Sequence, residues 1–246
     1  MRILLTNDDG IFAKGIQVLA RELEKYHEVI IVAPNTQRSA SSHSITISTP
    51  LIIKEEKIEG IKSKAFSVSG TPADCTRVGL MKLVEDKVDL VISGTNEGYN
   101  LGTDVIYSGT VSAAIEAAIL KVPSVAISCD GKDKSYNLAA KIAIDIAEKA
   151  KEFKNDIVLN VNIPHIDENI KNEIKVCRIG ERNYKNIFIE KLNEDGTRSI
   201  KIKGALEDSD TEETDVYNIK RGYTTITPLH YDLTNFNILE DVKKMF

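Results

Sequence analysis

The fold is decided by the stretch Ile3-Leu4-Leu5-Thr6-Asn7-Asp8-Asp9-Gly10. Its apolar first half is typical of a buried strand in a parallel sheet, and it breaks off into an amide, two adjacent carboxylates and a glycine. Ligands of an open α/β sheet bind beyond the carboxyl ends of the strands, which is where this pair is expected to lie. Asp8 and Asp9 repel each other unless a cation or a proton lies between them.

The octet alone leaves two interpretations of this acidic pair open. Oxygen ligands without a neighbouring His or Cys favour a hard cation, Mg²⁺ or Mn²⁺. The alternative is an acidic turn in which Asp8 or Asp9 caps the following helix. The rest of the chain has to decide between a metal site and a helix cap.

Composition predicts a globular protein that binds neither nucleic acid nor membranes. The chain has 246 residues, of which 42% are hydrophobic and 28% charged, enough for a full core. A net charge of −5 gives no basic surface for nucleic acid. No apolar run reaches the roughly 20 residues that span a bilayer. We also expect no secretory leader, because a strand begins at the second residue.

The cysteines indicate the compartment. Cys75, Cys129 and Cys177 are odd in number, widely spaced and surrounded by apolar residues. They form neither a zinc pattern nor a disulfide framework, so we expect buried free thiols. Free thiols are typical of a reducing compartment, and the sequence therefore predicts a cytoplasmic protein.

Strand-like and helix-like segments alternate through the first two-thirds of the chain. After the opening strand, further buried strands are expected at 28–33, 88–93, 122–128 and 157–161. Helices are expected at 14–25, 73–84, 109–120 and 136–153. This alternation predicts an α/β fold, with a mostly parallel, Rossmann-like sheet, right-handed crossovers and helices on both faces.

Two regions interrupt the alternation. Residues 36–69 are far longer than an ordinary strand–helix connection, and the alternating stretches 45–48 and 51–54 predict a hairpin or short strands there. After about residue 165, short strand-like segments and polar turns predict a β-rich extension. Such an extension cannot form its own core and has to pack on the main body or on another subunit.

These regions predict one domain, 1–246, with two parts. The first is a Rossmann-like core, 1–165, which includes the 36–69 insertion. The second is a β-rich extension, 166–246, which we expect to mediate oligomerisation.

Three of the predicted parallel strands end in polar loops, at 7–10, 35–44 and 94–110, and the first and last of these loops contain glycine. The last of these runs through Tyr107-Ser108-Gly109-Thr110 into a helix of small residues. A helix start of this composition offers free backbone N–H groups and a positive dipole end to an anion, usually phosphate. The alternative is a plain N-cap by Ser108, with Gly109 allowing close packing.

Paired acids and a phosphate-ready helix start on one sheet edge indicate metal-assisted phosphoryl chemistry. The cation and the N–H groups would neutralise phosphate charge while a water or a carboxylate attacks in line. P-loop and dinucleotide fingerprints are absent. A receiver domain also has adjacent acids after its first strand, but it is much shorter. It needs an Asp after its third strand and a Lys after its fifth, where this chain has Ser93-Gly94-Thr95 and Val161-Asn162-Ile163.

An ordered set of motifs between residues 5 and 234 resembles the SurE family (survival protein E). The motifs are TNDDG, VAP followed by RS, SGTPADC, SGTNEGYNLG, YSGTVSAA, LNVNIP and TPLHYDLT. The resemblance implies a Rossmann-like domain with a β-rich C-terminal arm that exchanges between subunits, giving a homodimer or homotetramer. It also implies a divalent-metal-dependent phosphatase that acts on nucleoside 5′- and 3′-monophosphates, and in some members on short polyphosphate.

The same resemblance assigns the site residues. One divalent cation per subunit, Mg²⁺ or Mn²⁺, would be held by Asp8, Asp9, Ser39 and Asn96. The phosphate would be bound by Asn96, Ser108, Gly109 and Thr110. Catalytic roles fall to Asp8, Asp9 and Asn96. The chain departs from the family's commonest pattern at Ala40, where Gly is frequent, and at Thr95, where Ile is frequent, but these departures remove no ligand.

The sequence therefore predicts a cytoplasmic 5′-nucleotidase that converts nucleoside monophosphates to nucleoside and phosphate. Two alternatives stay open. One is a broad acid phosphatase or polyphosphatase with little preference for nucleotides, and the other is a protein that binds a phosphorylated ligand without turnover. Base preference, the metal used and the identity of the nucleophile, a water or an Asp carboxylate, also stay open.

Overall fold

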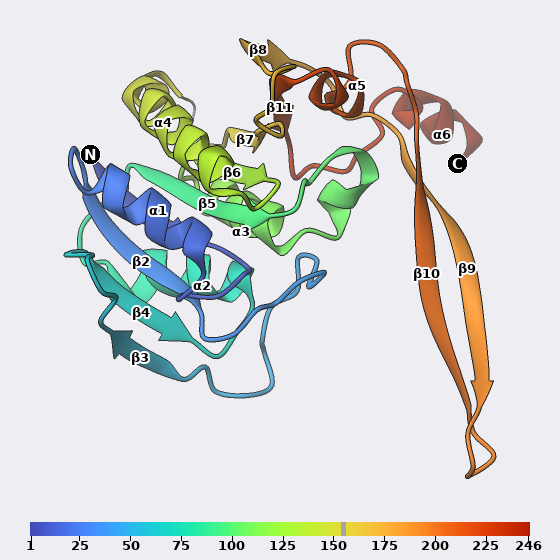
Figure 1. Ribbon diagram of the computed structural model, residues 1–246, viewed down its shortest axis with the longest axis horizontal. Helices are drawn as coiled ribbons and strands as arrows, with labels where there is room; N and C mark the ends of the chain where they lie inside the picture. The colour runs from blue at the N-terminus through green and yellow to red at the C-terminus, as the bar shows by residue number, and fades with distance from the viewer. Residues whose placement is uncertain (154–155) are drawn as a thin grey trace.

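A nine-stranded sheet forms the centre of the computed structural model, which describes residues 1–153 and 156–246 (Figure 1). The strands lie in the order β3-β4-β2-β1-β5-β6-β7-β11-β8. Their bounds are β1 Arg2–Thr6, β2 Glu28–Pro34, β3 Ile53–Glu56, β4 Lys64–Val68, β5 Leu90–Glu97, β6 Ser124–Cys129, β7 Val158–Asn162, β8 Lys171–Val176 and β11 Tyr223–Leu229.

The six central strands, from β4 to β7, are parallel, as predicted. The chain passes from β1 to β2 on one side and later returns to β5 on the other, so the strand order reverses between β1 and β5. Thr6, the last residue of β1, pairs with Ser93 of β5, and the loop that follows β1 therefore begins beside the last residues of β5, which ends at Glu97. Such a switch point is where an open α/β sheet forms its ligand crevice.

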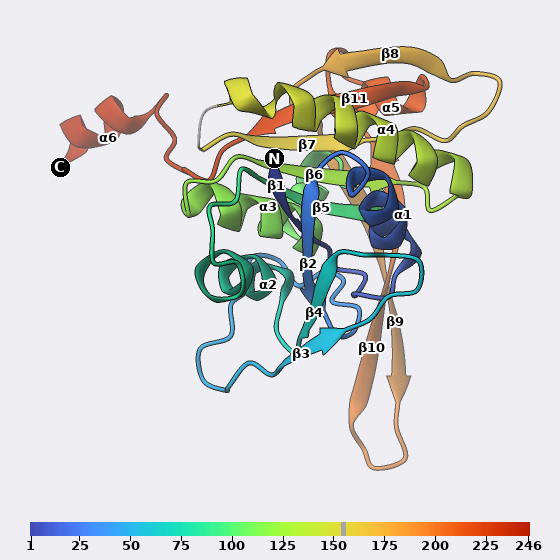
Figure 2. The ribbon, with the colours of Figure 1, turned by 90° about the vertical axis from the view of Figure 1, so that its left-hand side faces the viewer.

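Helices cover both faces of this sheet, as predicted. Their bounds are α1 Lys14–Leu23, α2 Pro72–Val78, α3 Gly109–Ile119, α4 Asp133–Lys149, α5 Asp215–Lys220 and α6 Leu239–Met245. Helices α1 and α4 lie on one face, and α2 and α3 lie on the other (Figures 1 and 2). Successive side chains of a strand point to opposite faces. Ile3 and Leu5 of β1 therefore join the core under α1 and α4, whereas Leu4 packs with Val32 and Cys75 on the α2 side.

The insertion between β2 and α2 supplies two strands, but the alternating stretch 45–48 is not one of them. Ile45 and Ile47 are 42% and 84% exposed, and this segment is held instead by Asp74, which accepts from Thr46 N at 3.0 Å. β3 begins at Ile53, and β4 adds to the edge of the sheet by pairing in parallel with β2. Alternation predicts which side chains share a face, but not whether a partner strand is available.

The C-terminal part of the chain divides between the main sheet and a separate hairpin. β11 pairs with β7 and β8 with β11, which extends the nine-stranded sheet. β9 (Arg182–Leu192) and β10 (Arg198–Asp208) form a two-stranded antiparallel hairpin that projects from the body, longer than the short strands predicted there (Figure 1). The short helix α5 and the terminal helix α6 had no counterpart among the predicted elements.

Cys75, Cys129 and Cys177 are buried free thiols, as expected. In the described ranges, each helix is too short or too polar to cross a membrane.

Candidate active site

One pocket of about 430 Å³ lies where β1, β5 and the start of α3 meet. Its lining includes Asp8, Ser39, Asn96 and Ser108, four of the residues named from the sequence. Asp9 lies directly beside them, and Gly109 and Thr110 contact Asp8 from α3. The tertiary structure therefore brings all the sequence-predicted site residues to one end of the sheet.

Asp8 is almost fully buried, at 5% exposure, and it is fixed by the first turn of α3. The Thr110 hydroxyl donates a hydrogen bond to Asp8 Oδ1 at 2.5 Å. An ideal Cβ added to Gly109 would lie 2.9 Å from Asp8 Cβ and 3.1 Å from Asp8 Oδ2. The helix start thus lies directly against the carboxylate, and only glycine permits this approach.

Asp9 connects the other two loops. Its Oδ2 accepts from the backbone N–H of Glu97 at 3.0 Å, and its Oδ1 accepts from Gln37 Nε2 at 3.2 Å. One carboxylate thereby links the end of β5 to the loop 35–44. Asn7 acts locally, because its side chain bonds both the N–H and the C=O of Gly10 and so closes the turn.

Asn96 comes from a bulged segment of β5. The strand continues beyond Ser93, where the sequence had predicted its end, and its register with β6 shifts between Gly94 and Asn96. A bulge re-aims side chains that would otherwise follow the strict alternation of a strand. Asn96 Nδ2 donates to Gly98 O at 2.7 Å, which leaves Oδ1 as the amide atom available to a ligand.

The loop that carries Ser39 is anchored on both sides of that residue. Arg38 N donates to Asp8 O at 2.7 Å, and Ser42 N donates to Tyr107 O at 3.1 Å. The next residue, His43, places Nε2 2.9 Å from Oε2 of Glu116, a 2% exposed carboxylate on α3. Ser39 is exposed and lines the pocket, on a loop that is attached to the turn after β1 and to α3.

The start of α3 is both an N-cap and a candidate anion site, the two interpretations that the sequence left open. Ser108 is an N-cap, since its Oγ accepts from Val111 N at 3.1 Å, and Gly109 does serve close packing. The same turn also borders the pocket, where the positive end of the helix dipole favours an anion. The Thr110 hydroxyl is committed to Asp8, a link between residues 102 positions apart that no sequence pattern indicated.

Electrostatics favour a cation at this site. Burial, together with the neighbouring charge of Asp9, raises the pKa of Asp8 to about 6, although the hydrogen bond from Thr110 lowers it. Burial also raises the pKa of Asp9. In the described part of the chain, neither carboxylate forms an ion pair with Lys or Arg. A bound cation would supply the positive charge that the protein itself does not place there.

The donor chemistry fits a hard divalent cation. The four expected ligands offer oxygen only, from two carboxylates, one amide and one hydroxyl. In addition, the buried Ser41 Oγ lies next to Gly109 and has no hydrogen-bond partner within the described residues. Groups of three or more His, Cys, Asp or Glu side chains suited to a metal are also absent from those residues, so the carboxylate pair and its neutral neighbours are the candidate.

We expect Asp8→Asn to stabilise the metal-free protein at neutral pH but not in acid. The pKa of Asp8 is raised in the fold, so protonation favours the folded state, and stability falls as the pH rises from about 4 to about 6. The shift corresponds to a cost of about 2 to 3 kcal/mol at pH 7. The free energy of unfolding can be measured with denaturant in the presence of chelator between pH 4.5 and 7.5. As the pH rises through this range, the value for Asp8→Asn should increase by about 2 kcal/mol relative to that of the wild type.

Asp74→Asn is the matched control with the opposite sign. Burial alone would raise the pKa of Asp74, but hydrogen bonds from Thr46 and Thr71 outweigh it and lower the pKa. Asp74 therefore contributes stability above its unfolded pKa, and its substitution gives no gain as the pH rises. If the difference in free energy of unfolding between Asp8→Asn and wild type did not change with pH, it would contradict the raised pKa of a buried Asp8.

Comparisons with known proteins identify the family of this chain. The family profile described as Survival protein SurE matches residues 3–186. A protein named 5′-nucleotidase SurE from Clostridium botulinum (strain ATCC 19397 / Type A) is 53% identical over 251 residues, covering 100% of this chain and 99% of the relative. The protein of the same name from strain 657 / Type Ba4 is 52% identical, with the same coverage.

A solved structure gives the same result for the fold. The crystal structure of SurE protein from Aquifex aeolicus has a TM-score of 0.83 to this chain at 39% identity, and the match covers 100% of this chain and 99% of that one. The family profile spans most of the chain, and the relatives match it from end to end. The chain therefore belongs to the SurE family.

Proposed function

We propose that this protein is a divalent-metal-dependent 5′-nucleotidase that hydrolyses nucleoside 5′-monophosphates, and also 3′-monophosphates, to nucleoside and phosphate. The observation that carries the proposal is the buried Asp8–Asp9 pair lying against the N-terminus of α3 at the switch point of the sheet. The proposal is supported by the high identity to proteins named 5′-nucleotidase SurE.

The proposed roles come from the family resemblance, and the contacts in the pocket support them. Asp8, Asp9, Ser39 and Asn96 would hold one Mg²⁺ or Mn²⁺ per subunit. A divalent cation in this position neutralises charge on the phosphate oxygens and lowers the pKa of a water. Thr110 orients Asp8 through its hydroxyl, and the backbone at Ser108 and Gly109 meets the phosphate at the positive end of α3. Asn96 contributes its amide oxygen beside them.

The test of the proposal is phosphate release from a panel of substrates with Mg²⁺ or Mn²⁺ present. We expect kcat/KM for AMP to exceed that for an aryl phosphate by about 10-fold or more, since only the nucleotide fills the pocket beyond the phosphate. Short polyphosphate is included because the family resemblance implies it as a further substrate. Equal rates with AMP and the aryl phosphate would favour a broad phosphatase, and metal-dependent phosphate binding without release would favour a binding protein.

The projecting hairpin supports a homo-oligomer. Its exposed apolar side chains are Ile187, Phe188, Ile189, Leu192, Ile200, Ile202 and Leu206. A two-stranded hairpin is marginally stable by itself, and large exposed apolar patches are typical of interaction sites. We assign this surface to a second copy of the chain, which makes 166–246 an oligomerisation extension attached to the 1–165 core. Light scattering on the full chain distinguishes a homodimer from a homotetramer.

The buried free thiols support a cytoplasmic location, because a reducing compartment keeps cysteines in this state.

A further inference from the structure

Tyr184, on β9, lines the same pocket as the proposed metal ligands. All the other described lining residues lie between positions 8 and 108, so this tyrosine is the contribution of the C-terminal extension to the site. Tyr184 is 43% exposed, and a large part of its ring is thus available to a ligand. Tyr184 and Asp104 both line the pocket and are hydrogen-bonded to each other. They lie 80 positions apart in the sequence, and no single motif includes both.

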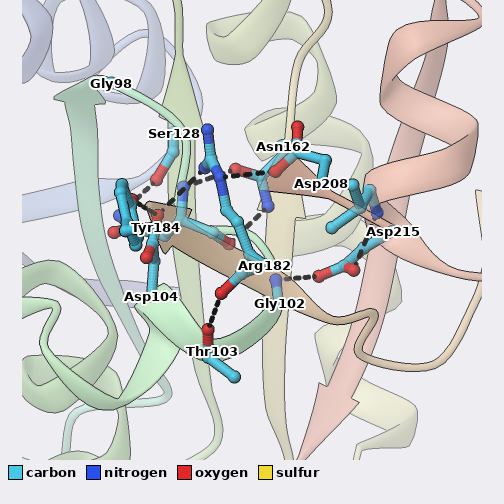
Figure 3. Close-up of polar contacts among 12 residues, drawn as sticks. Gly98, Gly102, Thr103, Asp104, Ser128, Asn162, Arg182, Tyr184, Asp208 and Asp215 are labelled. Carbon is cyan, nitrogen blue, oxygen red and sulfur yellow. Dashed lines mark hydrogen bonds and ion pairs between the residues drawn. The ribbon is translucent and has the colours of Figure 1, made fainter. Parts of the chain in front are cut away.

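Tyr184 is oriented by a hydrogen bond to Asp104, which also forms an ion pair with Arg182. Its hydroxyl donates to Asp104 Oδ2 at 2.7 Å, and Arg182 Nη1 lies 3.0 Å from the same oxygen (Figure 3). The Arg182 side chain is only 11% exposed, and it also reaches Asp208 at 3.3 Å. Burial and the hydrogen bond to Asp104 raise the pKa of Tyr184 to about 12, so the hydroxyl remains a donor at neutral pH.

The ring also rests on the neighbouring strand. An ideal Cβ at Gly204 of β10 would lie 3.0 Å from Tyr184 Cδ1. The absence of a side chain at Gly204 lets the ring lie close to the backbone of β10. One side of the ring is therefore supported by β10, while its hydroxyl is held at the loop that carries Asp104.

The base of the hairpin and the pocket loop are joined into one unit. Buried Asp215 accepts from Gly102 N at 2.9 Å, and Thr103 Oγ1 donates to Arg182 O at 2.6 Å (Figure 3). Asp215 also accepts from Gly180 N at 2.7 Å. An ideal Cβ at Gly102 would lie 2.9 Å from Arg182 Cβ, so the two segments are in close contact. This anchoring holds Tyr184 at a constant position relative to the pocket.

We propose that Tyr184 is a specificity-determining residue, against whose ring the nucleobase packs while the phosphate lies at Asp8 and Ser108. The inference rests on the proposed nucleotidase function and adds the recognition of the leaving nucleoside. A rigid aromatic ring stacks on any base, because every base has a π-face. Tyr184 therefore selects nucleotides over phosphate esters that lack a base, without choosing among bases.

The ring contributes to binding and not to the charge that develops at phosphorus. Its loss therefore acts on KM for substrates that carry a base and leaves kcat close to the wild-type value. A substrate without a base, such as ribose 5-phosphate, has nothing to stack and does not sense the ring. A purely structural function of Tyr184 would instead affect both substrates alike.

The experiment measures kcat and KM of the full-length protein for AMP and ribose 5-phosphate with Mg²⁺ or Mn²⁺ present. For Tyr184→Ala we expect KM for AMP to rise about 10-fold or more, with kcat within about 3-fold. KM for ribose 5-phosphate stays unchanged. Tyr184→Phe keeps the ring and loses only the bond to Asp104, so its KM for AMP stays within about 3-fold of wild type.

Tyr26→Ala is the matched control, because Tyr26 is 66% exposed and is not among the described pocket-lining residues. Its kinetics should equal those of the wild type. A Tyr184→Ala variant with unchanged KM for AMP, or with equal losses on both substrates, overturns the inference. Wild-type protein that releases no phosphate from AMP but hydrolyses other esters overturns the proposed function itself, which is a separate result.

Discussion

Asp9→Asn is expected to reduce kcat/KM for AMP by about 1,000-fold or more, since the divalent cation supplies several kcal/mol of transition-state stabilisation. The substitution removes one of two adjacent negative charges but preserves the size and one acceptor oxygen of the side chain. In the wild type, Glu97 N donates to Asp9 Oδ2 at 3.0 Å, and the amide oxygen of the variant can still accept this hydrogen bond. The loss should therefore come from weaker cation binding and not from a changed fold.

The measurement compares phosphate release by the variant with release by wild-type protein before and after chelation. Chelation of the wild type should cause a loss of similar size, and added Mg²⁺ or Mn²⁺ should restore it. Asp133→Asn is the control, because Asp133 is a largely exposed acid in the first turn of α4 that pairs with Lys14. Full activity in Asp9→Asn, or activity that survives chelation, would sink the proposed mechanism.

Gly109→Ala is expected to lower kcat/KM by about 100-fold, because a displacement of about 1 Å at a reacting centre has an effect of this size. The added methyl group would lie 2.9 Å from Asp8 Cβ and 2.8 Å from Ser41 Oγ, closer than real Cβ contacts. Either Asp8 or the start of α3 has to move. Alanine is a better helix former than glycine, so α3 itself gains from the substitution.

This combination gives Gly109→Ala a distinctive signature. Helix content by circular dichroism should be unchanged while activity and metal-dependent stabilisation fall. Ser112→Ala is the control in the same helix, because the Ser112 hydroxyl donates to Ser108 O and not to Asp8. Ser112→Ala should retain activity within about 3-fold. A fully active Gly109→Ala would show that the approach of α3 to Asp8 has no function.

Local patterns predicted much of the fold because burial follows the periodicity of the sequence. The apolar run of β1 and the small-residue helix α3 lie close to their expected positions. The segment 45–48 failed this rule, since it forms no strand and is held by Asp74 through Thr46 N. The predicted helix 73–84 is α-helical only as far as Val78 and continues as a π-helical turn over Gly79–Leu83. There Gly79 lies against Leu4, a contact with the sheet that helix periodicity does not encode.

The sequence by itself determined the parallel sheet and the acidic pair at the end of β1, together with the ordered motifs that name the candidate ligands. These are local features, fixed by hydrophobic periodicity and by residue types at strand ends. The tertiary structure alone decided that Gly109 packs against Asp8, that Thr110 donates a hydrogen bond to it, and that Tyr184 of the extension lines the pocket. Asp8 and Thr110 are 102 positions apart, and Asp104 and Tyr184 are 80 positions apart. Such contacts depend on how strands pair and helices pack, which a local pattern does not specify.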